Sequence, residues 1–137
     1  MEKTKISHIG IAVKDLEASK KLFGTLFKVG QFHEETVADQ KVRIASFPVG
    51  DSIIELTEAT SEDSPIAKFI AKRGEGIHHV AFEVGDIASE LNRLSGEGFT
   101  FLSEEATKGA HEMLVAFLHP KSTNGVLVEL CQHEPTK

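Results

Sequence analysis

The chain has 137 residues, which is enough for one domain around one buried core. Its net charge is −6, and Lys and Arg are scattered among Asp and Glu without a basic block, so nucleic acid is not an expected partner. The start of the chain has no signal-peptide pattern, and no apolar run approaches the ~20 residues that span a bilayer. We therefore expect a cytoplasmic protein without membrane association. Cys131 is the only cysteine, which excludes an intramolecular disulfide and a metal site built on thiolates.

The first half of the chain has a strand–helix–strands pattern. Residues 6–13 alternate between two faces, which predicts a strand. A helical stripe follows, with Asp15 as its N-cap and with Gly30 at its end. Further strands are predicted near 31–38, 41–49 and 52–58.

The second half repeats this pattern after a connecting segment. Ser64 followed by Pro65 is a typical helix start, so a linking helix is predicted over 64–73. Next come a strand over 77–84 and a helix capped by Asp86 and ended by Gly96 and Gly98. The remaining strands are predicted near 99–103, 112–119 and 125–131.

Internal similarity supports the same division. Residues 8–16 (HIGIAVKDL) resemble residues 79–87 (HVAFEVGDI), and residues 53–56 (IIEL) resemble residues 127–130 (LVEL). Two copies are too few for a solenoid, so a pair of modules fits better. The prediction is an α+β fold of two paired βαβββ modules within one domain, 1–137. The modules cover about 5–60 and about 76–132 and are joined by the helix over 64–73.

The repeat selects four polar residues on predicted strands: His8, Glu55, His79 and Glu129. A carboxylate among apolar strand residues is costly to bury unless it is paired, protonated or bound to metal. If the modules pair, two imidazoles and two carboxylates can bind one divalent cation without residual charge. Nitrogen and oxygen ligands suit Zn, Co, Ni, Mn or Fe(II). The alternative is that each is an ordinary satisfied or solvent-facing strand residue.

The other candidate groups are expected to be structural. His78 points to the face opposite His79, so we interpret it as a supporting residue. His33 and His133 are predicted to lie on the surface. Cys131 is predicted to be a small core residue rather than a nucleophile, because no base is identifiable beside it.

Three stretches carry a family resemblance: HIGIAVKDLEAS (8–19), DSPIAKFIAKRGEGIHHVAFEV (63–84) and GAHEMLVAFLHPKSTNGVLVEL (109–130). The pattern resembles the vicinal-oxygen-chelate (glyoxalase-like) superfamily, and within it the methylmalonyl-CoA epimerase family. The resemblance runs from about residue 5 to residue 132. It implies that the modules form a cup-shaped open barrel around a metal ion.

The resemblance also implies a site and a reaction. It places the metal ligands on His8, Glu55, His79 and Glu129, with one divalent ion per chain. The implied reaction is epimerisation at C2 of methylmalonyl-CoA through a metal-stabilised thioester enolate, with Glu129 as a catalytic acid or base. An acyl-CoA thioester is then the substrate, and a homodimer is expected.

Further residues are candidates for substrate contacts. Lys121 and Lys108 could bind the phosphates of coenzyme A, although solvated surface lysines are the alternative. Asp39, Gln40 and His111 could assist proton transfer or substrate binding.

One departure from the family pattern leaves the second base unassigned. Some members carry a catalytic Glu on the strand matching residues 41–49, which here reads KVRIASFPV and has no acid. Family members place either Gln or Glu at the position of Glu55.

Three other functions would also fit parts of this pattern. A lactoylglutathione lyase would share the fold, the metal and the proton-transfer chemistry, but it would act on a glutathione hemithioacetal. An extradiol-type dioxygenase needs open metal positions, against which a fourth protein ligand argues. A metal-free binding protein would contain no metal.

Overall fold

Two similar runs of strands and helices follow one another along the chain. The computed structural model describes residues 4–133. The elements are β1 (Lys5–Ala12), α1 (Leu16–Phe27), β2 (His33–Val37), η1 (Ala38–Gln40), β3 (Val42–Val49), β4 (Ser52–Ala59), α2 (Pro65–Arg73), β5 (Gly76–Glu83), α3 (Ile87–Gly96), β6 (Thr107–Lys108), η2 (Ala110–Glu112), β7 (Met113–Phe117), η3 (Pro120–Ser122) and β8 (Val128–His133), where η marks a short 3-10 turn.

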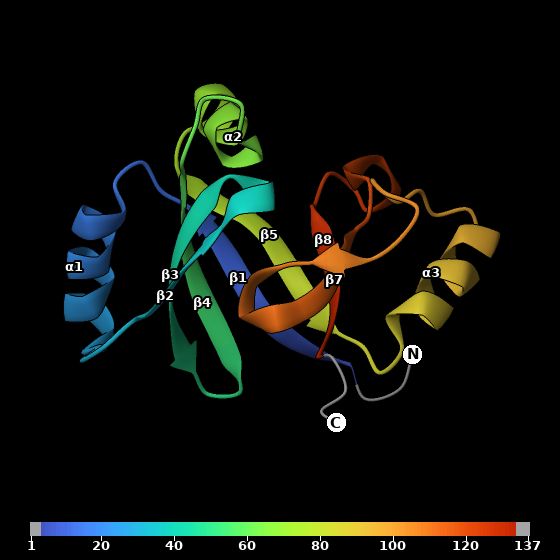
Figure 1. The fold of residues 1–137 in the computed structure, drawn as a ribbon, viewed down its shortest axis with the longest axis horizontal. Helices are drawn as coiled ribbons and strands as arrows, with labels where there is room; N and C mark the ends of the chain where they lie inside the picture. The colour runs from blue at the N-terminus through green and yellow to red at the C-terminus, as the bar shows by residue number, and fades with distance from the viewer. Residues whose placement is uncertain (1–3, 134–137) are drawn as a thin grey trace. The chain divides into compact units, whose positions relative to one another are not determined.

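Residues 8–78 form one compact unit, called here the N-terminal unit. Its strands are ordered β2-β3-β4-β1; β1 runs parallel to β4, and the other neighbours are antiparallel. Helix α1 lies along one side of these strands (Figure 1). The buried cluster beneath it contains Val13, Leu16, Ala45 and Leu56.

Local interactions explain where α1 begins and ends. The side chain of Asp15 accepts a hydrogen bond from the Ala18 N–H at 3.1 Å, as an N-cap does. The carboxylate of Glu58 accepts a second one from the Leu16 N–H at 2.9 Å. The helix ends at Phe27, because Lys28 takes a left-handed conformation with φ 55°. The predicted end at Gly30 was therefore wrong by one short turn.

Residues 79–133, with the start of β1, form the C-terminal unit. Its strands are ordered β5-β8-β7-β6, with β5 parallel to β8. Helix α3 begins after Asp86, whose carboxylate accepts from the Ser89 N–H at 3.2 Å. It packs on one side of β7 and β8 (Figure 1). The buried residues beneath it are Val84, Ile87, Leu91, Leu94, Ala116, Leu118 and Leu130.

The strand predicted near 99–103 is absent from its place. Phe101 makes only an isolated bridge with Leu118, and the short strand β6 lies farther along, at Thr107–Lys108. The Thr100 N–H donates to the Ser122 hydroxyl at 3.1 Å, so this segment bonds to a neighbouring turn. Phe99 and Phe101 pack against the α3 cluster. The predicted strand is thus reduced to one antiparallel bridge, flanked by hydrogen bonds from the Leu102 N–H to the Phe117 carbonyl oxygen at 2.8 Å and from the His119 N–H to the Thr100 carbonyl oxygen at 2.7 Å.

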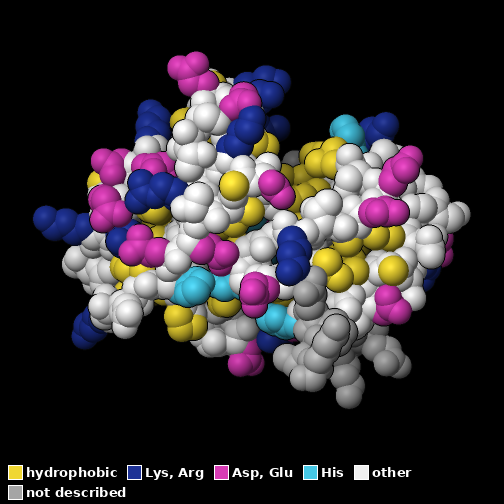
Figure 2. All heavy atoms as spheres, viewed as in Figure 1, with side chains coloured by type: hydrophobic (Ala, Val, Ile, Leu, Met, Phe, Trp, Pro, Cys, Tyr) yellow, Lys and Arg dark blue, Asp and Glu magenta, His cyan; other side chains and the backbone are white. Residues whose placement is uncertain are grey.

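The surface agrees with the mixed charge of the sequence. On the face drawn in Figure 2, Lys and Arg side chains are interspersed with Asp and Glu side chains. Among the described residues, no helix is both long and apolar enough to cross a membrane.

Candidate active site

The N-terminal unit carries a buried imidazole–carboxylate pair. Gly10 of β1 pairs with Glu55 of β4 in the parallel ladder, and His8 lies two residues before Gly10 on the same face of the strand. This register directs both side chains to one side of the sheet. His8 Nε2 lies 3.6 Å from Glu55 Oε1. His8 is 4% exposed and Glu55 is 2% exposed, so the pair is shielded from solvent.

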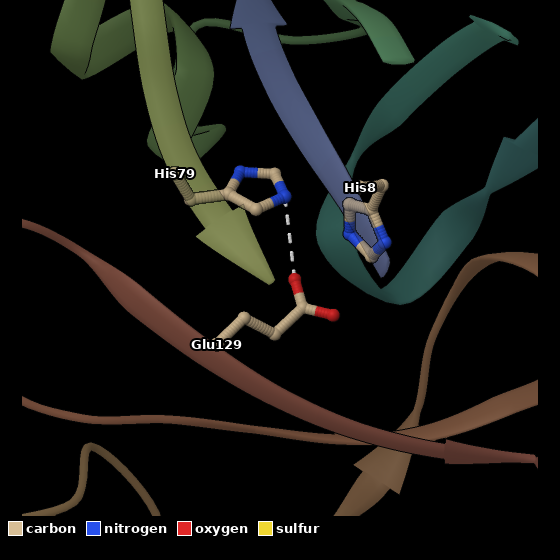
Figure 3. Close-up of side chains that lie close together, drawn as sticks. All are labelled: His8, His79 and Glu129. Carbon is tan, nitrogen blue, oxygen red and sulfur yellow. Dashed lines mark ion pairs between the residues drawn. The ribbon is translucent and has the colours of Figure 1, made fainter. Parts of the chain in front are cut away.

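The C-terminal unit carries a second pair with the same local arrangement. Ala81 of β5 pairs with Glu129 of β8 in a parallel ladder, and His79 lies two residues before Ala81. His79 Nε2 lies 3.3 Å from Glu129 Oε1 (Figure 3). Both residues are buried. The sequence repeat therefore places the same pair of residues, a histidine and a glutamate on neighbouring parallel strands, in each unit.

The surroundings of the two pairs differ. On the antiparallel side, Ser46 of β3 is opposite Glu55, whereas Phe117 of β7 is opposite Glu129. The Phe117 ring meets the His79 imidazole edge-on, with 5.8 Å between the ring centroids. Sequence reasoning missed both neighbours. Their positions follow from the ladder register, which no single strand reveals.

The donor set fits a divalent cation. A carboxyl group is costly to bury unless it is paired, protonated or bound to metal, and both glutamates are buried among apolar strand residues. Two ligand atoms about 2.1 Å from one ion at a tetrahedral angle lie about 3.4 Å apart. The nitrogen–oxygen distances within the pairs, 3.6 and 3.3 Å, match that spacing better than the ~2.9 Å of a tight hydrogen bond. Neutral imidazoles and two carboxylates would balance a charge of +2.

His33, His78, His133 and Cys131 lie where the sequence predicted. His33 and His133 are exposed. The ring of His78 lies edge-on to Phe69 of α2 at 5.1 Å, and burial lowers the pKa of His78 to about 4, so it is neutral at pH 7. Cys131 is fully buried, and its Sγ lies 3.6 Å from the carbonyl oxygen of Phe82. This placement confirms Cys131 as a core residue.

The candidate substrate residues lie in short connecting segments. Lys121 is exposed in η3, and Lys108 is exposed on β6 rather than in a loop. His111 sits in η2 with a left-handed φ of 57°. Gln40 lies in η1 of the N-terminal unit and is partly buried; the adjacent Asp39 is exposed. Their substrate contacts stay predictions.

Comparison with known proteins shows to which family the chain belongs. Residues 7–117 match the Glyoxalase/Bleomycin resistance protein/Dioxygenase superfamily. The chain belongs to this superfamily. Within it, the chain is 40% identical over 132 residues to the ethylmalonyl-CoA/methylmalonyl-CoA epimerase of Cereibacter sphaeroides, with 93% of this chain and 97% of that protein covered.

Solved structures agree over nearly the whole chain. A methylmalonyl-CoA epimerase in complex with methylmalonyl-CoA and NH4+ is similar at a TM-score of 0.92 and 36% identity, over 98% of this chain and 97% of that one. A Streptomyces coelicolor methylmalonyl-CoA epimerase variant in complex with 2-nitronate-propionyl-CoA is similar at 0.91 and 35% identity, over 97% and 96%. These matches confirm the glyoxalase-like α+β fold and the epimerase-type isomerase class predicted from the sequence.

Proposed function

We propose that the chain is a metal-dependent epimerase that inverts C2 of methylmalonyl-CoA. The observation that carries this proposal is the pair of buried His–Glu arrangements in a chain of the epimerase family. The substrate assignment is supported by the relatives, which are named as methylmalonyl-CoA epimerases.

His8, Glu55, His79 and Glu129 would together hold one divalent ion. Each unit would supply one imidazole and one carboxylate; the pair from the C-terminal unit, His79 and Glu129, is joined by the dashed line in Figure 3. A bound cation would supply Lewis-acid stabilisation for negative charge that develops on the substrate oxygens. Zn, Co, Ni and Mn all accept such nitrogen and oxygen ligands.

Proton transfer is then carried out by the protein's side chains. Glu129 serves as a base, so that the C2–H bond breaks, its electron pair moves toward the thioester oxygen and the proton passes to the carboxylate. Inversion requires that a proton return to C2 on the opposite face. The apolar contacts around the pair, including Phe117 beside His79, limit access of water to the carboxylate.

The substrate's nucleotide end would be bound through charge. Coenzyme A carries phosphates, and Lys121 of η3 and Lys108 of β6 are exposed cations of the C-terminal unit. Their role is to attract and position the thioester rather than to take part in proton transfer.

The experiment is metal analysis of the purified protein together with deuterium uptake at C2 of methylmalonyl-CoA in D2O. We expect one divalent ion per chain and uptake that stops when a chelator removes the metal. Full activity after chelation would overturn metal dependence. A glutathione hemithioacetal that reacts far faster than methylmalonyl-CoA would replace this proposal with lactoylglutathione lyase activity.

A further inference from the structure

Thr57 carries a buried hydroxyl that lies outside the two His–Glu pairs. The residue lies on β4 and is 4% exposed. Its Oγ1 is a buried atom without a hydrogen-bond partner among the described residues. A buried hydroxyl without a partner costs free energy, and valine has nearly the same shape without that cost. The hydroxyl therefore calls for an explanation beyond packing.

The cross-strand neighbours of Thr57 provide no side-chain acceptor for its hydroxyl. Across the two ladders it pairs with Ala12 of β1 and Ile44 of β3, and neither side chain can accept a hydrogen bond. The equivalent position in the C-terminal unit, two residues after Glu129, is Cys131. There the Sγ approaches the Phe82 carbonyl oxygen at 3.6 Å. Thr57 has no counterpart to that contact, so the two units differ at this position.

The polar side chain nearest along the same face of β4 belongs to Glu55. Residues two apart on a strand point to the same side and have Cα atoms about 6.6 Å apart. Three rotatable bonds allow the glutamate side chain to reach along the strand toward Thr57. Glu55 Oε1 lies 3.6 Å from His8 Nε2, and a carboxylate has lone pairs for several partners at once.

We propose that Thr57 is a positioning residue whose hydroxyl donates a hydrogen bond to the Glu55 carboxylate when that carboxylate binds a metal ion. The inference rests on the metal centre of the proposed function. A hydroxyl held in this way fixes the orientation of a ligand, as the partners of metal ligands commonly do. It also explains why a hydroxyl without a partner is kept beside an apolar pair of neighbours.

The test is Co²⁺ binding by three variants, followed by titration of the visible absorption of the bound ion. Thr57→Val removes only the hydroxyl, and Thr57→Ser keeps it. Thr36→Val is the matched control, because Thr36 is an exposed threonine on strand β2 of the same unit. The thermal stability of each metal-free protein is measured in parallel.

We expect Thr57→Val to weaken Co²⁺ binding about 10- to 100-fold and to change the absorption bands, while its metal-free stability stays equal or rises. Thr57→Ser should bind within a few-fold of the wild-type affinity, and Thr36→Val should bind normally. Unchanged affinity and spectrum in Thr57→Val would overturn the inference and leave the proposed function intact. An equal loss of metal-free stability in both Thr57 variants would also overturn it, in favour of a packing role. A wild-type chain that binds no Co²⁺ would overturn the metal centre itself.

Discussion

Ser46 stands directly opposite Glu55 in the antiparallel ladder of β3 and β4. Strand β3, Val42–Val49, contains no acid, and the residue that it places opposite Glu55 is a serine. Glu55 is consequently the only acid that β3 and β4 place on the face that carries His8. It could act as a metal ligand, as a base, or as both, and the choice decides how the proton returns to C2.

Glutamine substitutions at the two glutamates separate these roles. Glutamine is nearly isosteric with glutamate and still offers a carbonyl oxygen to a metal, but it cannot accept a proton at catalytic pH. We expect Glu55→Gln to keep the metal and most of the activity. Glu129→Gln should keep some metal but lose about 10²–10⁴-fold in turnover, because a general base is removed. Metal content and C2 exchange are measured on the same preparations.

The opposite result would reassign Glu55. If Glu55→Gln binds metal normally yet loses activity by the same margin as Glu129→Gln, then Glu55 is the second base. The two glutamates of the repeated pairs would then serve opposite faces of the substrate.

Alanine substitutions of the histidines test the metal ligands. His8→Ala and His79→Ala should each lose the bound metal, because each removes one nitrogen donor of the proposed set. His33→Ala is the control, since His33 is an exposed histidine outside the pairs. Imidazole must be neutral to coordinate, so metal affinity in the wild type should also fall below about pH 6. Retention of the metal by both variants would refute the assignment.

Sequence reasoning predicted the parts of the fold that depend on local chemistry. The caps at Asp15 and Asp86 lie where expected because a short acidic side chain before an apolar stripe marks a helix start. The alternation in β1 was also interpreted correctly, although the face of His8, Gly10 and Ala12 is the more buried one and Ile9 and Ile11 are only partly buried. The repeat identified the histidines and glutamates without any knowledge of the ladders.

The parts that sequence did not provide depend on pairing between distant segments. Residues 99–103 alternate like a strand because Phe99 and Phe101 pack against the α3 cluster, but their pairing is limited to the single bridge of Phe101 with Leu118. Likewise, Thr57 is an ordinary strand residue in the sequence. Its significance appears only when Ala12 and Ile44 are seen on either side of it.

The cap of α3 should make a measurable contribution to stability. Hydrogen bonds from the backbone and then the side chain of Ser89 hold the pKa of Asp86 below its ordinary value of 3.8. The ionised form is therefore favoured by folding, and its stabilisation is present above that value and is lost as pH falls through the lowered pKa. Asp86→Ala should lower the Tm by a few degrees at pH 7, whereas Asp86→Asn, which keeps the acceptor, should lower it less.

The pH dependence distinguishes the cap from a general charge effect. Below pH 4, Asp86→Asn should lose stability less steeply than the wild type, as measured by thermal unfolding from pH 7 to pH 2. Glu62→Gln, which removes an exposed acid from a connecting segment, serves as the control and should follow the wild-type curve. Parallel curves for Asp86→Asn and the wild type would show that the cap does not contribute in this way.

The two lysines provide the test of coenzyme A binding. Lys121→Ala and Lys108→Ala should each raise KM for methylmalonyl-CoA about two- to fivefold, since exposed charge contacts contribute roughly 0.2–1 kcal/mol. The kcat should stay unchanged, because both residues are assigned to the nucleotide end of the substrate rather than to C2. Lys72→Ala, which removes an exposed lysine from α2, is the matched control.

The decisive comparison uses a short methylmalonyl thioester without the nucleotide and its phosphates. On that substrate the two variants should match the wild type, because the group they bind is missing. An effect that persists on the short thioester would show that the lysines act on the thioester itself or on the fold, and would remove them from the phosphate site.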